Sequence, residues 1–134
     1  MKYIYIISLL LIAFACSEQE EKAPKKEQVE NLIEIKDGIY KEFYPGKKHI
    51  KITGPVGDNN AREGKWVFLA ENGEEMSICF YENGKREGHS IVKYPTGAIH
   101  YVGEYHNDKM IGIWEFFDEK GKLATTKDYG QPAE

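Results

Sequence analysis

Short runs of alternating side chains, separated by glycine-containing turns, make up the chain from about residue 64 onward. In the run 65–70, Trp66 and Phe68 fall on one face of an extended strand. Val67 and Leu69 fall on the other face, so a sheet built from this run is apolar on both sides. The pattern predicts a β-strand.

Two kinds of turn signal bound the strands. Residues 71–73 form a turn that contains glycine, and residues 75–81 return as a second strand. The Asn83-Gly84 pair then turns the chain again, and Asn-Gly favours a type I′ turn because both residues tolerate positive φ. We therefore predict a β-hairpin.

The hairpin pattern recurs with a period of 24 residues. A fourth, degenerate copy begins at Gly38, with Tyr40 in the column of Trp66 and Trp114, and the surplus residues fall in the turn-rich segment 54–60. Thirteen glycines and seventeen aromatic residues also suit many short strands and tight turns. We predict an all-β domain of β-hairpin repeats of about 24 residues each. Three columns are identical in all three full copies: Gly64, Gly88 and Gly112; Gly73, Gly97 and Gly121; Tyr81, Tyr105 and Tyr129.

Residues 1–15 are predicted to be a secretory signal peptide. Lys2 precedes an apolar run from Tyr3 to Ala15 that ends in small residues. As a helix this run spans about 20 Å, less than the ~30 Å hydrocarbon core of a bilayer, so a retained transmembrane anchor is disfavoured.

The sequence Ala13-Phe14-Ala15-Cys16, followed by Ser17, resembles the lipobox of bacterial lipoproteins. The resemblance implies that Cys16 becomes the first residue after cleavage and carries acyl chains, and several such chains together hold a protein on a membrane. Lipoboxes usually carry Leu at the position of Ala13, so an ordinary A-x-A cleavage site is the alternative.

Residues 16–34 are predicted to be the lipidated cysteine and a disordered tether. Ser17 to Asn31 contains five Glu and three Lys but almost no apolar side chain, so it cannot bury a core. Fifteen such residues reach about 20 Å on average. The acidic residues after the cysteine resemble a surface-export signal of lipoproteins in one Gram-negative phylum, which implies an outer-membrane protein whose domain faces outside the cell. A lipid-anchored outer-membrane protein that faces the periplasm is the alternative. This signal consists of Glu18, Glu20 and Glu21.

Residues 35–134 form the predicted repeat domain. Its repeat motif resembles the MORN-repeat variant family of bacteria. The resemblance implies an elongated, single-layer antiparallel sheet of consecutive hairpins, and some related proteins are labelled antitoxins of toxin–antitoxin pairs. The middle copy departs from the motif at Ser90, which replaces Trp, and at Asp108, which replaces Gly, so the packing of its hairpin is expected to differ. The motif residues are Gly64, Trp66, Gly73, Tyr81, Asn83, Gly84, Lys85 and Gly88 in the first copy, and Gly112, Trp114, Phe117 and Gly121 in the last.

No catalytic or metal-binding pattern is evident in the sequence. The four histidines, His49, His89, His100 and His106, lack the spacing of a zinc motif. Cys79 lacks an adjacent base, and the glycines recur at turn spacing with no helix to cradle a phosphate. A single-layer sheet also offers no pocket to raise the pKa of a carboxylic acid for glycoside hydrolysis. We predict a non-enzyme without cofactor or metal, although it has several carboxylates: Glu104, Glu115, Asp118 and Asp128.

Charge and composition narrow the possible partners. A net charge of -4 with 30% charged residues gives no basic footprint for nucleic acid, and this mild acidity also disfavours anionic lipid as the ligand. Charged side chains lie at both open edges of the sheet: lysines in the degenerate copy that begins at Gly38, and Asp128 in the last copy. They oppose edge-to-edge pairing of two molecules, so we expect a monomer.

Aromatic side chains are the candidate binding residues. A row of them can stack on a glycan or grip a partner protein, while the alternative is that they only cover one another and the thin core. The leading hypothesis is a membrane-tethered interaction or scaffold module of the cell envelope. An immunity protein that neutralises a toxin and a glycan-binding protein are the alternatives. The candidate residues are Trp66, Trp114, Tyr81, Tyr105 and Tyr129.

Overall fold

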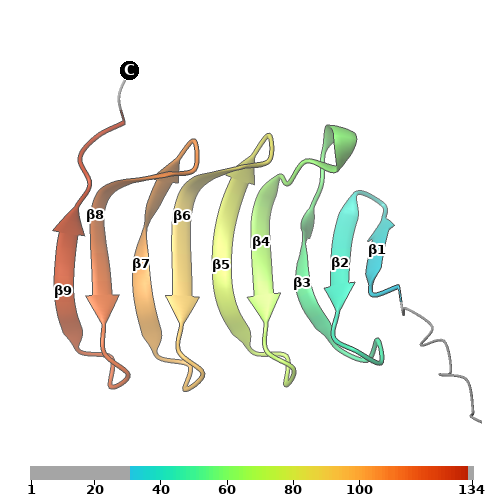
Figure 1. Ribbon diagram of the computed structural model, residues 1–134, viewed down its shortest axis with the longest axis horizontal. Helices are drawn as coiled ribbons and strands as arrows, with labels where there is room; N and C mark the ends of the chain where they lie inside the picture. The colour runs from blue at the N-terminus through green and yellow to red at the C-terminus, as the bar shows by residue number, and fades with distance from the viewer. Residues whose placement is uncertain (1–30, 133–134) are drawn as a thin grey trace, which may run out of the picture.

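The computed structural model describes residues 31–132, which form one open antiparallel sheet of nine strands in sequence order (Figure 1). This confirms the predicted all-β fold of consecutive hairpins. The predicted signal peptide and Cys16 lie outside the described residues. The strands are β1 (Ile33–Lys36), β2 (Ile39–Phe43), β3 (Ile50–Pro55), β4 (Gly64–Leu69), β5 (Glu75–Glu82), β6 (Lys85–Lys93), β7 (Ile99–His106), β8 (Lys109–Phe117) and β9 (Leu123–Asp128).

The sheet begins slightly earlier than the sequence suggested. Ile33 and Glu34, which fall within the predicted tether, belong to β1 and lie opposite Glu42 and Lys41 of β2. β1 is only four residues long, which is too short for its alternating pattern to stand out after the hydrophilic segment that precedes it.

The turns follow the 24-residue period at both rims of the sheet. At one rim, Gly73, Gly97 and Gly121 have φ of 89, 86 and 78°. Each donates its backbone N–H to the carbonyl oxygen three residues earlier, at 2.9 Å. A side chain at such a φ is strained, which explains why this column is glycine in every copy.

Two-residue turns occupy the other rim and include the expected type I′ turn, with φ of 50° at Asn83 and 82° at Gly84. Asn107 and Asp108 repeat this geometry with φ of 48 and 67°, so the departure at Asp108 leaves the turn intact. The Asp108 carboxylate accepts hydrogen bonds from the backbone N–H of Arg86 at 2.9 Å and from its Nε at 3.1 Å. These bonds hold the aspartate in a conformation that otherwise favours glycine.

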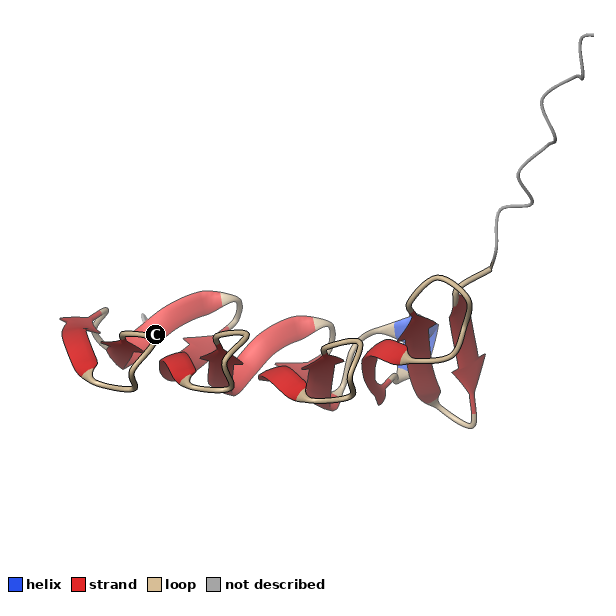
Figure 2. Cartoon of the chain, turned by 90° about the horizontal axis from the view of Figure 1, so that it is seen from below, coloured by secondary structure: helices blue, strands red, loops and turns tan. Residues whose placement is uncertain are grey.

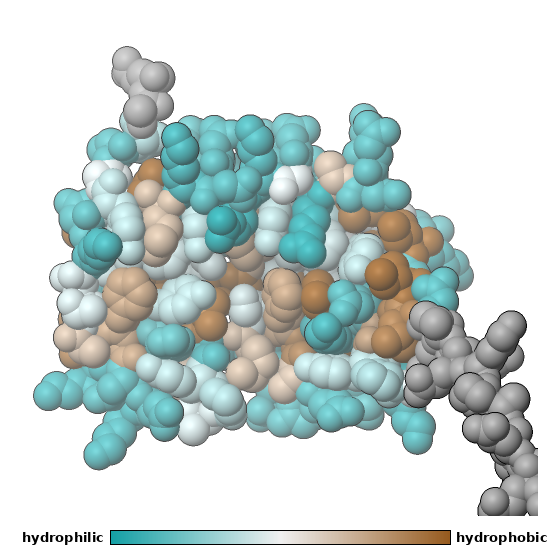
Figure 3. Space-filling view, in the orientation of Figure 1, coloured by the Kyte–Doolittle hydropathy of each residue, from teal (hydrophilic) through white to brown (hydrophobic). Residues whose placement is uncertain are grey.

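No second layer covers the sheet among the described residues. Viewed from below, the strands follow one another along the long axis, and the only helical element within residues 31–132 is one 3-10 turn, Asp58–Asn60, between β3 and β4 (Figure 2). Polar side chains gather at the two rims where the turns lie, and apolar ones lie over the strands (Figure 3). The core is correspondingly thin. The buried residues among 31–132 are Ile52, Trp66, Cys79, Ser90 and Trp114, of which the two tryptophans are fully buried.

Candidate interaction surface

The two faces of the sheet differ in side-chain chemistry. Residues paired across strands share a face, so Trp66, Cys79, Ser90 and Gly103 lie on one side. Trp114 lies on this side too, because its indole ring occupies the space that a Cβ on Gly103 would need. We name this side the aromatic face.

Trp66 is the centre of one aromatic cluster. It is 1% exposed, and its ring centroid lies 5.2 Å from that of Tyr40 and 6.0 Å from that of Tyr81. The Arg62 guanidinium lies 4.2 Å from the indole centroid and donates to the Tyr81 hydroxyl at 3.0 Å. The indole Nε1 donates to the carbonyl of Pro55 at 2.9 Å, so no polar atom of the ring is left for a ligand.

Trp114 is the centre of a second cluster. It is also 1% exposed, with Tyr105 and Tyr129 edge-on at 5.0 and 6.2 Å between centroids. The guanidinium carbon of Arg86 lies 4.1 Å from the ring centroid of Tyr105, and Nζ of Lys127 lies 4.6 Å from the ring centroid of Tyr129. Burial raises the pKa of the Tyr105 phenol, as expected for a hydroxyl held within this cluster.

The structure therefore places the five candidate aromatic residues in two packed clusters rather than in one open row. The faces of Trp66 and Trp114 are used inside the protein, as in the alternative in which the aromatics cover one another. Tyr129, at 36% exposed, is the most accessible of the five. Burial was hard to foresee from the sequence, because a single-layer sheet has no opposite layer to bury a tryptophan.

The opposite side, which we name the aliphatic face, carries a continuous row of branched side chains. Val67, Ile78, Ile91 and Val102 are consecutive cross-strand partners on β4, β5, β6 and β7. Glu115 on β8 continues the row. Nothing in the described part of the chain packs over it, and the row is only half-buried.

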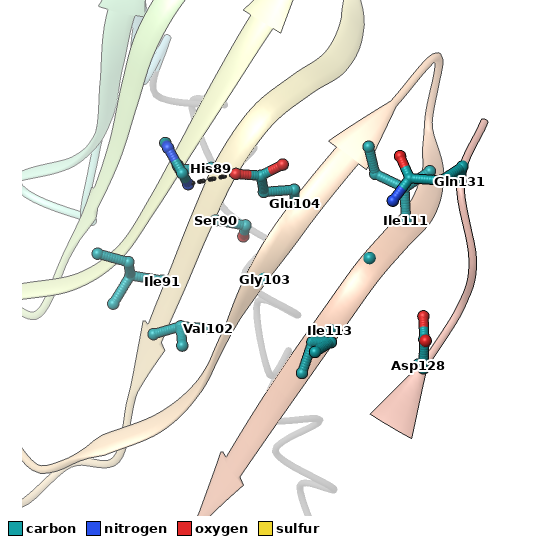
Figure 4. A pocket seen from close by; sticks show the side chains of 11 residues that line it. His89, Ser90, Ile91, Val102, Gly103, Glu104, Ile111, Ile113, Asp128 and Gln131 are labelled. Carbon is teal, nitrogen blue, oxygen red and sulfur yellow. Dashed lines mark ion pairs between the residues drawn. The ribbon is translucent and has the colours of Figure 1, made fainter. Parts of the chain in front are cut away.

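A hollow of about 590 Å³ lies beside this row, over β6 to β9 (Figure 4). Gly103 and Gly112 line it without side chains, while the neighbouring Ile113 is 65% exposed. Ile113 lines the hollow together with Ile111 and Val102, and a contiguous exposed apolar patch of this kind marks an interaction surface. Besides the two glycines, the hollow is lined by residues His89, Ser90, Ile91, Val102, Glu104, Ile111, Ile113, Asp128 and Gln131.

The charges around the hollow are mostly negative. Glu104 lies opposite His89, with 3.2 Å between Oε1 and Nδ1, and Asp128 lies opposite Ile113. Glu115 pairs with Val102 at the end of the aliphatic row. These three carboxylates were noted in the sequence as possible acids, and the structure brings them to one face around an apolar floor. This arrangement suits a ligand that combines apolar and cationic groups.

Glu87 and Cys79 lie outside the hollow, and their pKa values are shifted by local hydrogen bonds and burial. Glu87 accepts the backbone N–H of Asn107 at 2.9 Å and contacts Nδ1 of His106 at 2.8 Å, which lowers the pKa of its carboxyl. Burial raises the pKa of the Cys79 thiol. Within residues 31–132, no cluster of three or more His, Cys, Asp or Glu side chains is arranged to hold a metal ion.

The described residues contain no helix that is long and apolar enough to span a bilayer. In the comparisons with known proteins, no protein-family model, no curated protein and no solved structure matches this chain.

Proposed function

We propose that this protein is a lipid-anchored module of the outer membrane that binds a partner protein through the aliphatic face of its sheet. The observation that carries the proposal is the uncovered row Val67, Ile78, Ile91 and Val102. Four adjacent strands extend such a row over about 14 Å. The free energy falls when a partner removes apolar surface of this kind from water.

The chemistry of the partner follows from the hollow. Its apolar floor favours aliphatic or aromatic side chains, and the carboxylates of Glu104, Glu115 and Asp128 favour Lys or Arg beside them. The partner segment that we propose is therefore a protein segment with alternating apolar and basic residues. The glycan alternative has less support, because the rings proposed to stack on a sugar pack inside the two clusters.

The anchor rests on the sequence. Ala13-Phe14-Ala15-Cys16 supports acylation at Cys16, and the hydrophilic residues that follow support a tether. The resemblance to MORN-repeat variants is part of the same proposal, and the succession of similar hairpins supports it. An antitoxin-like protein would be one version of this module, with a toxin as the partner.

Photo-crosslinking in intact cells tests the binding surface. A benzophenone amino acid at Ile113 should yield one defined adduct, whereas the same group at Tyr129 on the aromatic face should not. Ile91→Asn should weaken the adduct at position 113, and Ile99→Asn, an exposed site elsewhere, should leave it unchanged. Equal adducts at positions 113 and 129, or none at 113, would refute the proposed surface.

Fractionation tests the anchor separately. Intact mass should show acyl chains on Cys16 of the mature chain, and Cys16→Ser should move the protein from the membrane to the soluble fraction. An unmodified mature chain would refute the anchor.

A further inference from the structure

Three isoleucines are exposed at the N-terminal end of the sheet. Ile33, Ile35 and Ile39 on β1 and β2 are 47%, 45% and 39% exposed. The space-filling view shows hydrophobic side chains gathered over this end (Figure 3). We name these three residues the isoleucine end. The register places Ile33 and Ile35 on one face of the sheet and Ile39, opposite Lys36, on the other, so exposed isoleucines flank this edge on both faces.

The same end has the opposite charge balance to the rest of the domain. Residues 32–53 contain five lysines and three carboxylates, whereas residues 54–132 contain nine basic and thirteen acidic side chains. The acidic net charge of the whole chain therefore conceals a basic end. The five lysines are Lys36, Lys41, Lys47, Lys48 and Lys51.

Only part of this positive charge is neutralised locally. Lys47 pairs with Glu34 at 3.0 Å, and Lys51 pairs with Glu42 at 2.7 Å. The other three lysines, Lys36, Lys41 and Lys48, form no ion pair within residues 31–132 and are all exposed. Lys36 and Lys41 lie on the face of Ile39, so this edge carries free positive charge together with exposed isoleucines, the combination that binds an anionic lipid surface.

The position of this end in the chain points to the same ligand. Fifteen residues separate Cys16 from Leu32, the residue before β1. A tether of that length keeps the isoleucine end within about 20 Å of an acylated cysteine on average. Lipid headgroups are therefore the surface that this end meets at the highest effective concentration.

We propose that the isoleucine end lies on an anionic lipid surface, with the isoleucines at the boundary of headgroups and acyl chains and Lys36, Lys41 and Lys48 at lipid phosphates. The tether in this argument comes from the proposed function. Docking at β1 directs the sheet away from the bilayer. The hollow over β6 to β9 then lies about 25 Å or more from the docked strand, at about 4.8 Å for each strand, and stays open to a partner.

Photo-crosslinking to lipid tests this orientation with a matched pair of sites. Ile35 and Leu123 are 45% and 46% exposed and lie on the two opposite edge strands. The mature protein, purified from membranes in detergent, is reconstituted on vesicles of phosphatidylethanolamine and phosphatidylglycerol. A benzophenone amino acid at position 35 should gain the mass of a phospholipid, and the same group at position 123 should not.

Charge variants separate docking from simple tethering. Lys36→Gln, Lys41→Gln and Lys48→Gln together should lower the lipid adduct at position 35 about a hundredfold, from roughly fivefold for each lysine. The matched variant with Lys109→Gln, Lys120→Gln and Lys122→Gln should leave it unchanged. Vesicles of phosphatidylcholine alone should give the same loss as the first variant.

The outcomes distinguish this inference from the proposed function. Equal lipid adducts at positions 35 and 123, or an adduct at 35 that is insensitive to the lysines, would overturn docking while leaving the anchor intact. A wild-type protein that fails to float with the vesicles would overturn both. Circular dichroism of each variant verifies that the sheet is folded, because all six lysines are on the surface.

Discussion

The indole ring of Trp114 on β8 fills the space above Gly103 on β7, so that a single added methyl group on Gly103 would overlap the ring. Trp66 on β4 has the same relationship to Gly54 on β3. Each tryptophan is buried in a one-layer sheet because the neighbouring strand leaves room for it. The pairing of a large with a small side chain thus creates a core without a second layer.

Gly103→Ala should therefore destabilise the domain by about 1 to 3 kcal/mol, because the indole must shift out of its packed position. Chemical denaturation measures this loss. Gly57→Ala is the matched control, since its added methyl would meet only the flexible side chain of Glu63. A similar loss in both variants would contradict the proposed packing and indicate a general effect of removing glycine.

In the middle repeat, a small residue replaces the tryptophan and a larger residue replaces the glycine. Ser90 stands where the other copies have tryptophan, and its cross-strand partner on the preceding strand is Cys79 rather than glycine. Without an indole above it, this position accommodates a side chain. Both residues are buried, at 5% and 6% exposure, so the departure from the motif leaves no open gap.

A double-mutant cycle tests this compensation. Ser90→Trp alone should cost about 1 to 3 kcal/mol of stability by overpacking against Cys79. Combined with Cys79→Gly, it should cost less than the sum of the two single changes, because the pair then matches Trp114 and Gly103. Additive losses, measured by denaturation of all four proteins, would show that the two sites do not share one packing space.

The repeat period was enough to predict the hairpins, but not this packing. The glycines of the turns recur every 24 residues, so their columns are visible in the sequence. Gly54 and Gly103 lie 49 residues apart, which is not a multiple of 24, and Cys79 stands between them, so no glycine column is visible there in the sequence. The hollow was also hidden, because its residues come from several strands and become neighbours only through the register.

The turn at Asp108 leads to a pH prediction. The backbone N–H and guanidinium of Arg86 donate to the Asp108 carboxylate and hold its pKa below the ordinary value. A lowered pKa in the folded state means that the ionised carboxylate contributes stability above the unfolded value of about 3.9. That contribution is lost as the pH falls through the lower pKa of the folded state.

Asp108→Asn should accordingly lower the melting temperature at pH 7, and the difference from the wild type should shrink in strong acid. Asn tolerates the positive φ of this turn, so the change removes mainly the charge. Glu119→Gln in an exposed turn is the control and should have little effect at any pH. A difference between Asp108→Asn and the wild type that persists unchanged in strong acid would assign the effect to the turn conformation.

Cys79 should react slowly with thiol reagents in the folded protein. It is 6% exposed, and burial raises its pKa, so both access and the thiolate fraction are low. In the Cys16→Ser variant, Cys79 is the only cysteine, and its alkylation should become at least about tenfold faster in denaturant. Equal rates with and without denaturant would show that the aromatic face opens readily around Cys79.

Ile113 and Trp114 are neighbours in sequence but lie on opposite faces, so their substitutions should separate binding from stability. Ile113 is 65% exposed, and Ile113→Ser should change the free energy of unfolding by no more than about 0.5 kcal/mol. Trp114→Ala should cost about 3 to 5 kcal/mol, because it empties the centre of a packed cluster. If the aliphatic face binds the partner, Ile113→Ser should nevertheless weaken partner capture by a crosslinker placed at Val102. A stable Ile113→Ser variant that captures the partner as well as the wild type would place the interaction elsewhere on the sheet.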